Sequence, residues 1–532
     1  MKPMYKILMG AMAGVIALAM APALAKTPAN MLVIANRIDD ITTLDPAESF
    51  EFAGGDLSRN VYGNLVNFDP MDLAAGYKPD LAESWVVSAD GKTITFKMRP
   101  GVKFHSGNPV TAADAVYSLR RAVKLSKTPS FILTQFGFNA KNADQTIKMI
   151  DDMTLSITTD KKYATSFVLN CLTATIGGIV DKKVVMKHAA NGDMGNAWLK
   201  THTAGSAAYQ LVNWKPNESY TLKANHDFYS GAPKMERVIV RHIAESATQR
   251  LLLEKGDIDV ARNLNPQDIA GIQASSDVAV DSDLRGRLMY FSLNQKDPIL
   301  SNPKVVKAFK YLVDYKGMQD SFLKGQYTIH QAFLPKTYLG AIDDQPYSLN
   351  VKKAKALLAE AGYAKGFKVN MIVRKAQERI EIAQSLQNTF AQAGIKSTIT
   401  VGTGKQTLSK YRAREFQIYV GAWGPDYPDP NTNAATFAIN EDNSDAAKST
   451  GQLAWRNSWS IPKMSKATKA AVQEGDRDKR AAMYAAIERE QQKIAPFVVM
   501  FQKIEQTGRR ANVKNFSVGA AISKAAYWDV TK

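Results

Sequence analysis

Cysteine is almost absent from this chain of 532 residues, which contains only Cys171. A single thiol cannot form an intramolecular disulfide, and a chain of this size can fold by core burial alone. Cys171 stands in the apolar segment 167–172. This context favours a buried small hydrophobic side chain over a reactive nucleophile.

The motifs of common exported hydrolases are also missing. The six histidines are isolated from one another, so no His-Glu-x-x-His zinc motif occurs, and there is no Gly-x-Ser-x-Gly segment. The carboxylate pairs Asp257/Asp259 and Asp426/Asp429 are of a kind common in turns. These absences make a secreted hydrolase the weakest alternative, and they predict no catalytic residue, no cofactor and no metal site.

Beyond residue 25, no apolar run approaches the roughly 20 residues needed to span a bilayer. Residues 1–25 have the pattern of a secretory signal peptide: two lysines, an apolar stretch, and Ala23-Leu-Ala25 before a cleavage site. No cysteine follows Ala25, which excludes lipid attachment there. We therefore expect an exported, soluble mature chain that begins near residue 26.

Positive charge is in excess, with 68 Lys and Arg against 50 Asp and Glu and a formal net charge of +18. Such an excess is compatible with nucleic acid, an anionic membrane surface or acidic ligands. The basic residues are scattered, however, and doublets such as Arg120-Arg121 are their densest clusters. This pattern predicts a solvated basic surface and no nucleic-acid partner.

The first half of the chain alternates short strands with few helices. Asp90-Gly91 suits the tight turn of a hairpin between residues 85–87 and 93–98. Thr111 and Asp114 form a capping box that opens a helix through residue 123. Apolar spacing predicts a further helix over 57–66. Other expected elements are a helix at 246–253 and strands at 31–36, 154–158, 209–214, 219–223, 238–240 and 258–260.

From residue 288 the predicted strands and helices alternate, which is typical of a second, compact α/β domain. The expected strands are 288–293, 367–373, 395–401, 416–420 and 496–501. The expected helices are 305–313, 351–361, 380–393 and 478–494, and Gly362 and Gly394 follow two of them.

The segment 421–430, Gly-Ala-Trp-Gly-Pro-Asp-Tyr-Pro-Asp-Pro, follows one of these strands. Its prolines exclude a helix or an inner strand, so Trp423 and Asp426 are expected on a rigid loop. Loops that leave a strand often present recognition groups. An alternative stays open, in which Asp426 caps its own turn and Trp423 fills the core.

Seven segments occur together in an order typical of one family. They are residues 81–85, 90–105, 107–119, 231–233, 253–260, 354–363 and 427–430. Through them the chain resembles the family 5 solute-binding proteins of ABC importers, the dipeptide- and oligopeptide-binding class. It departs from the family at 205–209, where Gly-Ser-Ala-Ala-Tyr replaces Gly-Thr-Gly-Pro-Tyr, a change that suits an ordered strand entry.

The resemblance implies a mixed α/β (α+β) fold, a two-lobed periplasmic clamshell that is class II-like with an enlarged first lobe. The large lobe would comprise residues 26–286 and 499–532, and the small α/β lobe residues 287–498. The ligand would lie between the lobes, and a membrane permease would transiently recognise the closed form. The protein would then be a monomeric periplasmic receptor.

The same resemblance implies that Asp426 pairs with the α-amino group of a peptide ligand, with Trp423 and Tyr427 beside it. Arg374 is the nearest candidate for the ligand's carboxylate, with a solvated arginine as the alternative. Asp426 argues against a metal ligand, because nickel-binding relatives replace the acidic signature. An oligosaccharide, an opine-like solute or a nickel complex remain the alternative ligands to a peptide.

Overall fold

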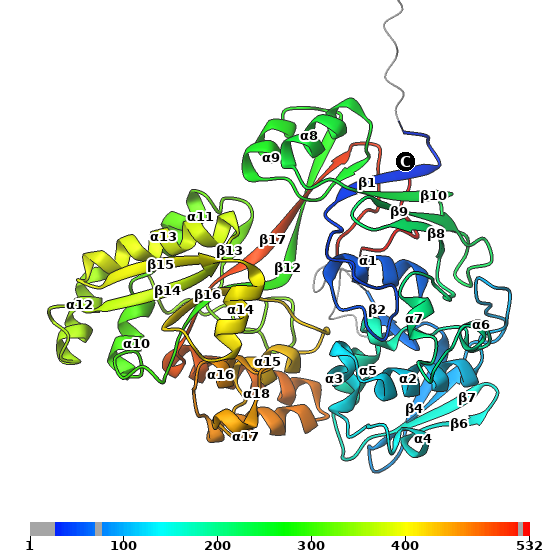
Figure 1. Cartoon of the computed structure of the whole chain (residues 1–532), viewed down its shortest axis with the longest axis horizontal. Helices are drawn as coiled ribbons and strands as arrows, with labels where there is room; N and C mark the ends of the chain where they lie inside the picture. Colours follow the sequence, from blue (N-terminus) through cyan, green and yellow to red (C-terminus); the bar gives the residue numbers. More distant parts are fainter. Residues whose placement is uncertain (1–26, 70–76, 520–524) are drawn as a thin grey trace, which may run out of the picture.

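The computed structural model describes residues 27–69, 77–519 and 525–532, so the predicted signal peptide lies outside the described residues. Two bodies lie side by side (Figure 1). Two long strands, β12 (Val278–Leu293) and β17 (Phe497–Arg510), connect them. The first body is built from the elements that precede β12, and the second from those between α10 (Pro303–Lys310) and α18 (Arg477–Ile494). No helix in the described ranges has the length and apolarity that a membrane crossing needs.

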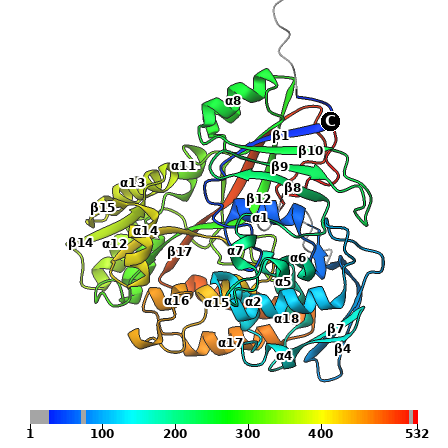
Figure 2. The ribbon, with the colours of Figure 1, turned by 45° about the vertical axis from the view of Figure 1, so that its right-hand side comes forward.

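One 11-stranded sheet extends through both bodies, in the order β15-β14-β16-β12-β17-β11-β1-β10-β9-β8 with β13 beside β17. The C-terminus lies next to β1, where Lys532 donates a hydrogen bond to the Met31 carbonyl (Figures 1 and 2). The other strands of this sheet are β1 (Met31–Asn36), β8 (Tyr209–Lys215), β9 (Ser219–Ala224), β10 (Arg237–His242), β11 (Val260–Ala261), β13 (Tyr327–Ile329), β14 (Lys368–Arg374), β15 (Lys396–Gly402) and β16 (Ile418–Trp423).

The first body holds a second sheet of four strands, ordered β4-β5-β7-β6. Its hairpin turns at Gly91, whose φ of +69° is the left-handed conformation that the Asp-Gly pair predicted. The predicted capping box is also confirmed, since Thr111 and Asp114 bond reciprocally at the start of α2. These elements are β4 (Ala82–Val87), β5 (Thr93–Met98), β6 (Ile147–Asp151), β7 (Thr154–Thr158) and α2 (Ala112–Leu125).

Shorter helices complete the first body and the connection to β12. They are α1 (Phe52–Val61), α3 (Phe131–Thr134), α4 (Ala143–Thr146), α5 (Thr165–Leu172), α6 (Lys182–Lys187), α7 (Asn196–Leu199), α8 (Ser246–Lys255) and α9 (Pro266–Ile272).

The helix predicted over residues 57–66 is wrong in its extent. Helix α1 ends at Val61, and Val66 instead opens β2 (Val66–Phe68), which pairs with β3 (Tyr77–Pro79). The apolar side chains of the segment divide between two hydrophobic clusters. Leu57 packs in the cluster beneath β1, whereas Leu65 packs beneath the four-stranded sheet. Their helical spacing was therefore coincidental, because no single face buries them together.

The second body has the predicted α/β alternation, with β14 parallel to both β15 and β16. Gly362 and Gly394 follow two of its helices with φ of +89° and +83°, as expected of glycines after a helix end. Its helices are α10 (Pro303–Lys310), α11 (Tyr315–Asp320), α12 (Val351–Glu360), α13 (Gln377–Gln392), α14 (Gly404–Arg412), α15 (Asn431–Phe437), α16 (Leu453–Arg456), α17 (Pro462–Gln473) and α18 (Arg477–Ile494).

The hydrophobic core is divided in the same way as the two bodies, with one exception. Both clusters around β14 and β16 are built only from residues between Leu288 and Phe501. The cluster of the four-stranded sheet contains the buried Cys171, as predicted, and belongs to the first body. That cluster also takes Tyr427 and Val472 from the second body. The two bodies therefore touch through buried apolar side chains as well as through β12 and β17.

Candidate ligand-binding site

A cavity of about 820 Å³ is lined by residues of both bodies. The first body contributes the segment before α1 and residues around α3, and the second contributes residues 422–427 with parts of α14, α15 and α16. Cavities of roughly 300–1,000 Å³ suit small-molecule ligands. The position and size of this cavity therefore fit a small solute held between the two bodies.

Trp423 is the last residue of β16 and lines the cavity. Its indole Nε1 donates a hydrogen bond of 3.1 Å to Asn433 Oδ1 on α15. The half-buried ring also lies edge-on to Phe437, with the ring centroids 6.4 Å apart. Trp423 therefore packs against the core of the second body with one part and forms cavity wall with the other.

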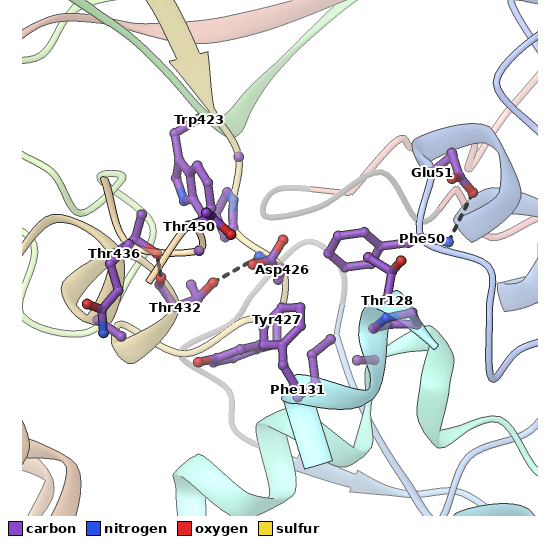
Figure 3. A pocket seen from close by; sticks show the side chains of 18 of the residues that line it. Phe50, Glu51, Thr128, Phe131, Trp423, Asp426, Tyr427, Thr432, Thr436 and Thr450 are labelled. Carbon is purple, nitrogen blue, oxygen red and sulfur yellow. Dashed lines mark hydrogen bonds between the residues drawn. The ribbon is translucent and has the colours of Figure 1, made fainter. Parts of the chain in front are cut away.

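Asp426 lies at the cavity wall with its carboxylate half-buried (Figure 3). Its backbone N–H donates to Thr432 Oγ1 at 2.9 Å, which fixes the loop. The carboxylate itself makes no hydrogen bond or ion pair with any residue that the structure describes, so it does not cap its own turn. Burial raises the pKa of Asp426 to about 7, and the positive charge of Arg456 opposes that rise.

Asp429, three residues further on, is completely buried and fully engaged. It accepts hydrogen bonds from Arg480 Nη1 and Nη2 at 2.9 and 2.7 Å, and from Asn170 Nδ2 of the first body at 3.0 Å. It also accepts the Asn431 N–H at 2.8 Å, so Asp429 is the carboxylate that caps this turn. Arg480 in turn donates to Ser166 Oγ at 3.1 Å. This network joins the loop to α18 and to α5.

Tyr427 is 2% exposed, and its ring enters the hydrophobic cluster of the first body. The ring centroid is 6.0 Å from that of Phe167 on α5. Its hydroxyl lies 3.5 Å from Gln135 Oε1, which makes the hydrogen bond long. Tyr427 therefore borders the cavity chiefly with its ring, while it joins the two bodies.

Arg374, the fourth predicted site residue, ends β14 and is exposed. Its guanidinium packs against Gly404: the guanidinium carbon is 3.1 Å from the point where a side chain on that glycine would begin. Arg374 is not among the residues that line the cavity. The structure thus brings Trp423, Asp426 and Tyr427 together and leaves Arg374 apart. Its role with a ligand carboxylate remains a prediction.

Several cavity residues had no signal in the sequence. Phe50 and Phe131 of the first body are 39% and 41% exposed, and their rings meet edge-on with centroids 5.9 Å apart. Both face the loop that presents Asp426 (Figure 3). Arg412 and Arg456 of the second body also line the cavity. No motif links these four residues, because only the fold brings their segments together.

The family model described as bacterial extracellular solute-binding proteins, family 5 Middle, matches residues 76–445. The Probable D,D-dipeptide-binding periplasmic protein DdpA of Escherichia coli (strain K12) is 27% identical over 496 residues, which cover 92% of each chain. Heme-binding protein A of Haemophilus influenzae is 26% identical over 402 residues, with 70% of each chain covered.

Solved structures agree with the family match. HbpA2 from Haemophilus parasuis superposes with a TM-score of 0.79 at 25% identity, over 94% of this chain and 99% of that one. The periplasmic binding protein DppA from Helicobacter pylori, in complex with the peptide STSA, has a TM-score of 0.77 at 23% identity, over 94% and 98%. These likenesses confirm the predicted mixed α/β fold of periplasmic binding proteins, and the family's members are binding proteins rather than enzymes. Since the family model matches well over half of the sequence, the chain belongs to the bacterial extracellular solute-binding proteins, family 5.

Proposed function

We propose that the protein is the periplasmic binding component of an ABC importer and captures a peptide or a similar solute with a protonated amino group. The observation that carries this proposal is the Asp426 carboxylate, which lies at the cavity wall without a hydrogen-bonding partner in the described chain. A partly desolvated carboxylate is unfavourable until a cation pairs with it. An ammonium group would supply charge-assisted hydrogen bonds worth about 1.5–3 kcal/mol each.

The remaining walls suit the apolar parts of such a ligand. Trp423 and Tyr427 come from the second body, and Phe50 and Phe131 from the first. A ligand that touches both walls stabilises the arrangement in which the walls face each other, so binding shifts the protein toward its closed form. Relatives named as binding a D,D-dipeptide, the peptide STSA or Met-Leu support a peptide over the other solutes of the family.

We infer that the lobes are residues 26–286 with 499–532 and residues 287–498. The division of the hydrophobic clusters supports the first crossing, because the two clusters around β14 and β16 begin at Leu288. They extend to Phe501, three residues beyond the second crossing inferred at 498. Residues 1–25 would direct export and be removed. The mature, monomeric protein would then meet its membrane permease transiently, in the closed form.

The test is a thermal-shift comparison of the mature protein with free di- and tripeptides, the same peptides N-acetylated, and a panel of glycans, opines and nickel–histidine. Free peptides should raise the melting temperature, and N-acetylation should remove most of that rise because Asp426 loses its cation. Equal stabilisation by acetylated peptides would contradict the role of Asp426. Stabilisation only by the glycans, opines or nickel complex would contradict the peptide ligand.

A further inference from the structure

The outer end of the second body is strongly basic. Three segments that are separate in the sequence meet there: α10, residues 351–368 with α12, and the start of β15. Figures 1 and 2 both show α12 and β14 at the end of the second body that lies farthest from the first body. We call the exposed lysines of this end the lysine face; they are Lys304, Lys307, Lys352, Lys353, Lys355, Lys365, Lys368 and Lys396.

Little of this charge is balanced within the chain. Lys304 pairs with Glu360 at 3.0 Å, and both side chains are more than half exposed. The other lysines of the face have no carboxylate oxygen within 4.0 Å among the residues that the structure describes. Glu360 is the only acidic residue in the segments 303–310, 351–368 and 394–397. The eight lysines and Glu360 therefore give this face a net charge of +7.

Two of these lysines oppose each other directly. β14 and β15 are parallel, and Lys368 and Lys396 are partners in their register. Partners on neighbouring strands project to the same face of a sheet, so the two ammonium groups are held on one side. Like charges in this arrangement lower stability. The repulsion would decrease if an anionic surface lay against both groups.

The residue types of the lysine face suit a diffuse negative surface better than one defined anion. The three segments contain no arginine. The guanidinium of Arg480, for comparison, holds Asp429 through two hydrogen bonds in a fixed geometry. An ammonium group is a point charge on a flexible stem, so it attracts anions without selecting one geometry. The segments also carry no exposed large hydrophobic side chain, so they offer nothing to insert into the apolar part of a bilayer.

We propose that the lysine face adsorbs to the anionic surface of a phospholipid bilayer and keeps the protein close to the membrane. The attraction is electrostatic and reversible, since several lysines act together near such a surface. The cavity between the bodies is lined by other residues, so adsorption leaves the solute site accessible. The inference goes beyond the proposed function, because it adds a lipid surface to the permease as a partner.

The competing interpretation is that these lysines only keep the surface hydrated. The whole chain has a formal net charge of +18, and three short segments supply +7 of it on one end of one body. Hydration does not require such a concentration of charge. Attraction to a charged surface, however, becomes stronger as more charge of one sign faces that surface. The distribution therefore favours adsorption over hydration alone.

The experiment is vesicle flotation of the mature protein. The vesicles contain phosphatidylcholine alone or with about one third phosphatidylglycerol, and both are tested at about 0.05 M and about 0.5 M salt. The protein should float with the anionic vesicles at low salt only, because salt screens the attraction between exposed charges. Equal binding to the neutral vesicles, or binding that survives high salt, would contradict an electrostatic face.

The first variant combines Lys352→Gln, Lys355→Gln, Lys368→Gln and Lys396→Gln. Its partition into anionic vesicles should fall about a hundredfold or more, since each lysine near such a surface changes the partition about fivefold. Its melting temperature should stay the same or rise, because the repulsion between Lys368 and Lys396 is removed. Its affinity for peptides should equal that of the natural protein.

The matched control combines Lys141→Gln, Lys148→Gln, Lys234→Gln and Lys255→Gln. These are exposed lysines of the first body, and none pairs with a carboxylate within the described part of the chain. The control loses the same charge and should still bind the anionic vesicles almost as well as the natural protein. If it loses as much binding as the first variant, adsorption depends on total charge and the lysine face is wrong.

Two further results would overturn the proposal. If the natural protein does not float with anionic vesicles at low salt, the lysine face does not bind a membrane. If it binds polyglutamate in calorimetry at the same salt and does not bind the vesicles, the partner is an acidic protein. Both results leave the proposed function standing, because the peptide thermal shifts do not depend on these lysines.

Discussion

The two aspartates of the loop that follows β16 lie three residues apart and have opposite environments. Asp429 is completely buried, accepts four hydrogen bonds and pairs with Arg480. Asp426 is half-buried at a cavity wall and has no such partner in the described chain. The comparison teaches that neither residue type nor motif assigns a role. Satisfied polar groups maintain the fold, and unsatisfied ones are available for a ligand.

The largest expected effect is the loss of stability on substitution of the buried Asp429. Asp429→Asn should lower the free energy of unfolding by about 3–5 kcal/mol, because it leaves the Arg480 guanidinium buried without its counter-ion. Urea denaturation of the mature protein measures this loss. Adding Arg480→Met to the variant should restore part of the stability, since it removes the uncompensated charge. A loss below about 1 kcal/mol would mean that the two aspartates do not differ as described.

Asp426→Asn makes the same substitution, carboxylate to amide, at the aspartate that lines the cavity. Peptide affinity should fall about tenfold to a hundredfold, because the neutral amide can still accept a hydrogen bond from the ammonium group but forms no ion pair with it. The melting temperature without ligand should stay the same or rise, since the buried charge is removed. Calorimetry and thermal unfolding of both variants, side by side, measure the contrast. If Asp426→Asn lowered the melting temperature, Asp426 would contribute to stability as Asp429 does, and the two residues would not differ as described.

The pH dependence of binding sharpens the same contrast. The pKa of Asp426 is raised to about 7, so its ionised fraction should increase about tenfold from pH 6 to pH 8. Peptide affinity should rise by about fivefold over this range, because roughly half of the peptide α-amino groups have lost their proton at pH 8. Most peptide ammonium groups remain protonated over much of this range. Titration calorimetry at several pH values measures the slope. Asp426→Asn should flatten it, and a slope that survives this substitution would assign the titration to another group.

Stability without ligand should depend on pH in the opposite direction. The folded-state pKa of Asp426 lies above the unfolded value near 4, so the folded protein binds more protons between these values. The contribution of Asp426 to stability is therefore greatest at low pH and decreases as the pH rises from about 4 to about 7. The difference in unfolding free energy between the natural protein and Asp426→Asn, measured across that range, isolates this contribution.

The smallest effect is expected at the residue beside Asp426. Tyr427→Phe keeps the ring in the cluster of the first body and removes only the hydroxyl, which lies 3.5 Å from Gln135 Oε1. Stability and peptide affinity should each change by less than about 1 kcal/mol, because so long a hydrogen bond contributes little. A larger loss of affinity would mean that the hydroxyl contacts the ligand directly.

Local signals in the sequence predicted the elements that local forces determine. The Asp90-Gly91 hairpin and the Thr111 capping box depend on neighbours in the chain, and both occur. The helix over 57–66 failed because its apolar residues face two different clusters, which are defined by distant segments. Strands β12 and β17 are longer than predicted, since their polar outer parts pair with each other and need no continuous apolar face.

The candidate site was predictable only in the loop after β16. Prolines and the resemblance to a family singled out Trp423 and Asp426, and both line the cavity. The position of Arg374 at the end of a strand did not determine the direction of its side chain, and in the structure Arg374 does not line the cavity. Phe50 and Arg412 lie hundreds of residues apart in the sequence, so their shared wall follows from tertiary structure alone.

The pairing between β12 and β17 shifts register at two places, between Leu284 and Leu288 and between Met289 and Tyr290. Leu284 pairs with Ile504, and the next paired residue of β12, Leu288, meets Gln502, so β12 takes four steps where β17 takes two. The carbonyl of Arg285 in this stretch accepts its hydrogen bond from the Gln502 side chain at 2.9 Å. An irregularity of this kind leaves residues unpaired and bends the strand locally. We therefore expect the connection to act as a flexure in the mechanical sense, a stiff ribbon with compliant sections at these two places, which would let the cavity admit a solute while the regularly paired stretches stay intact.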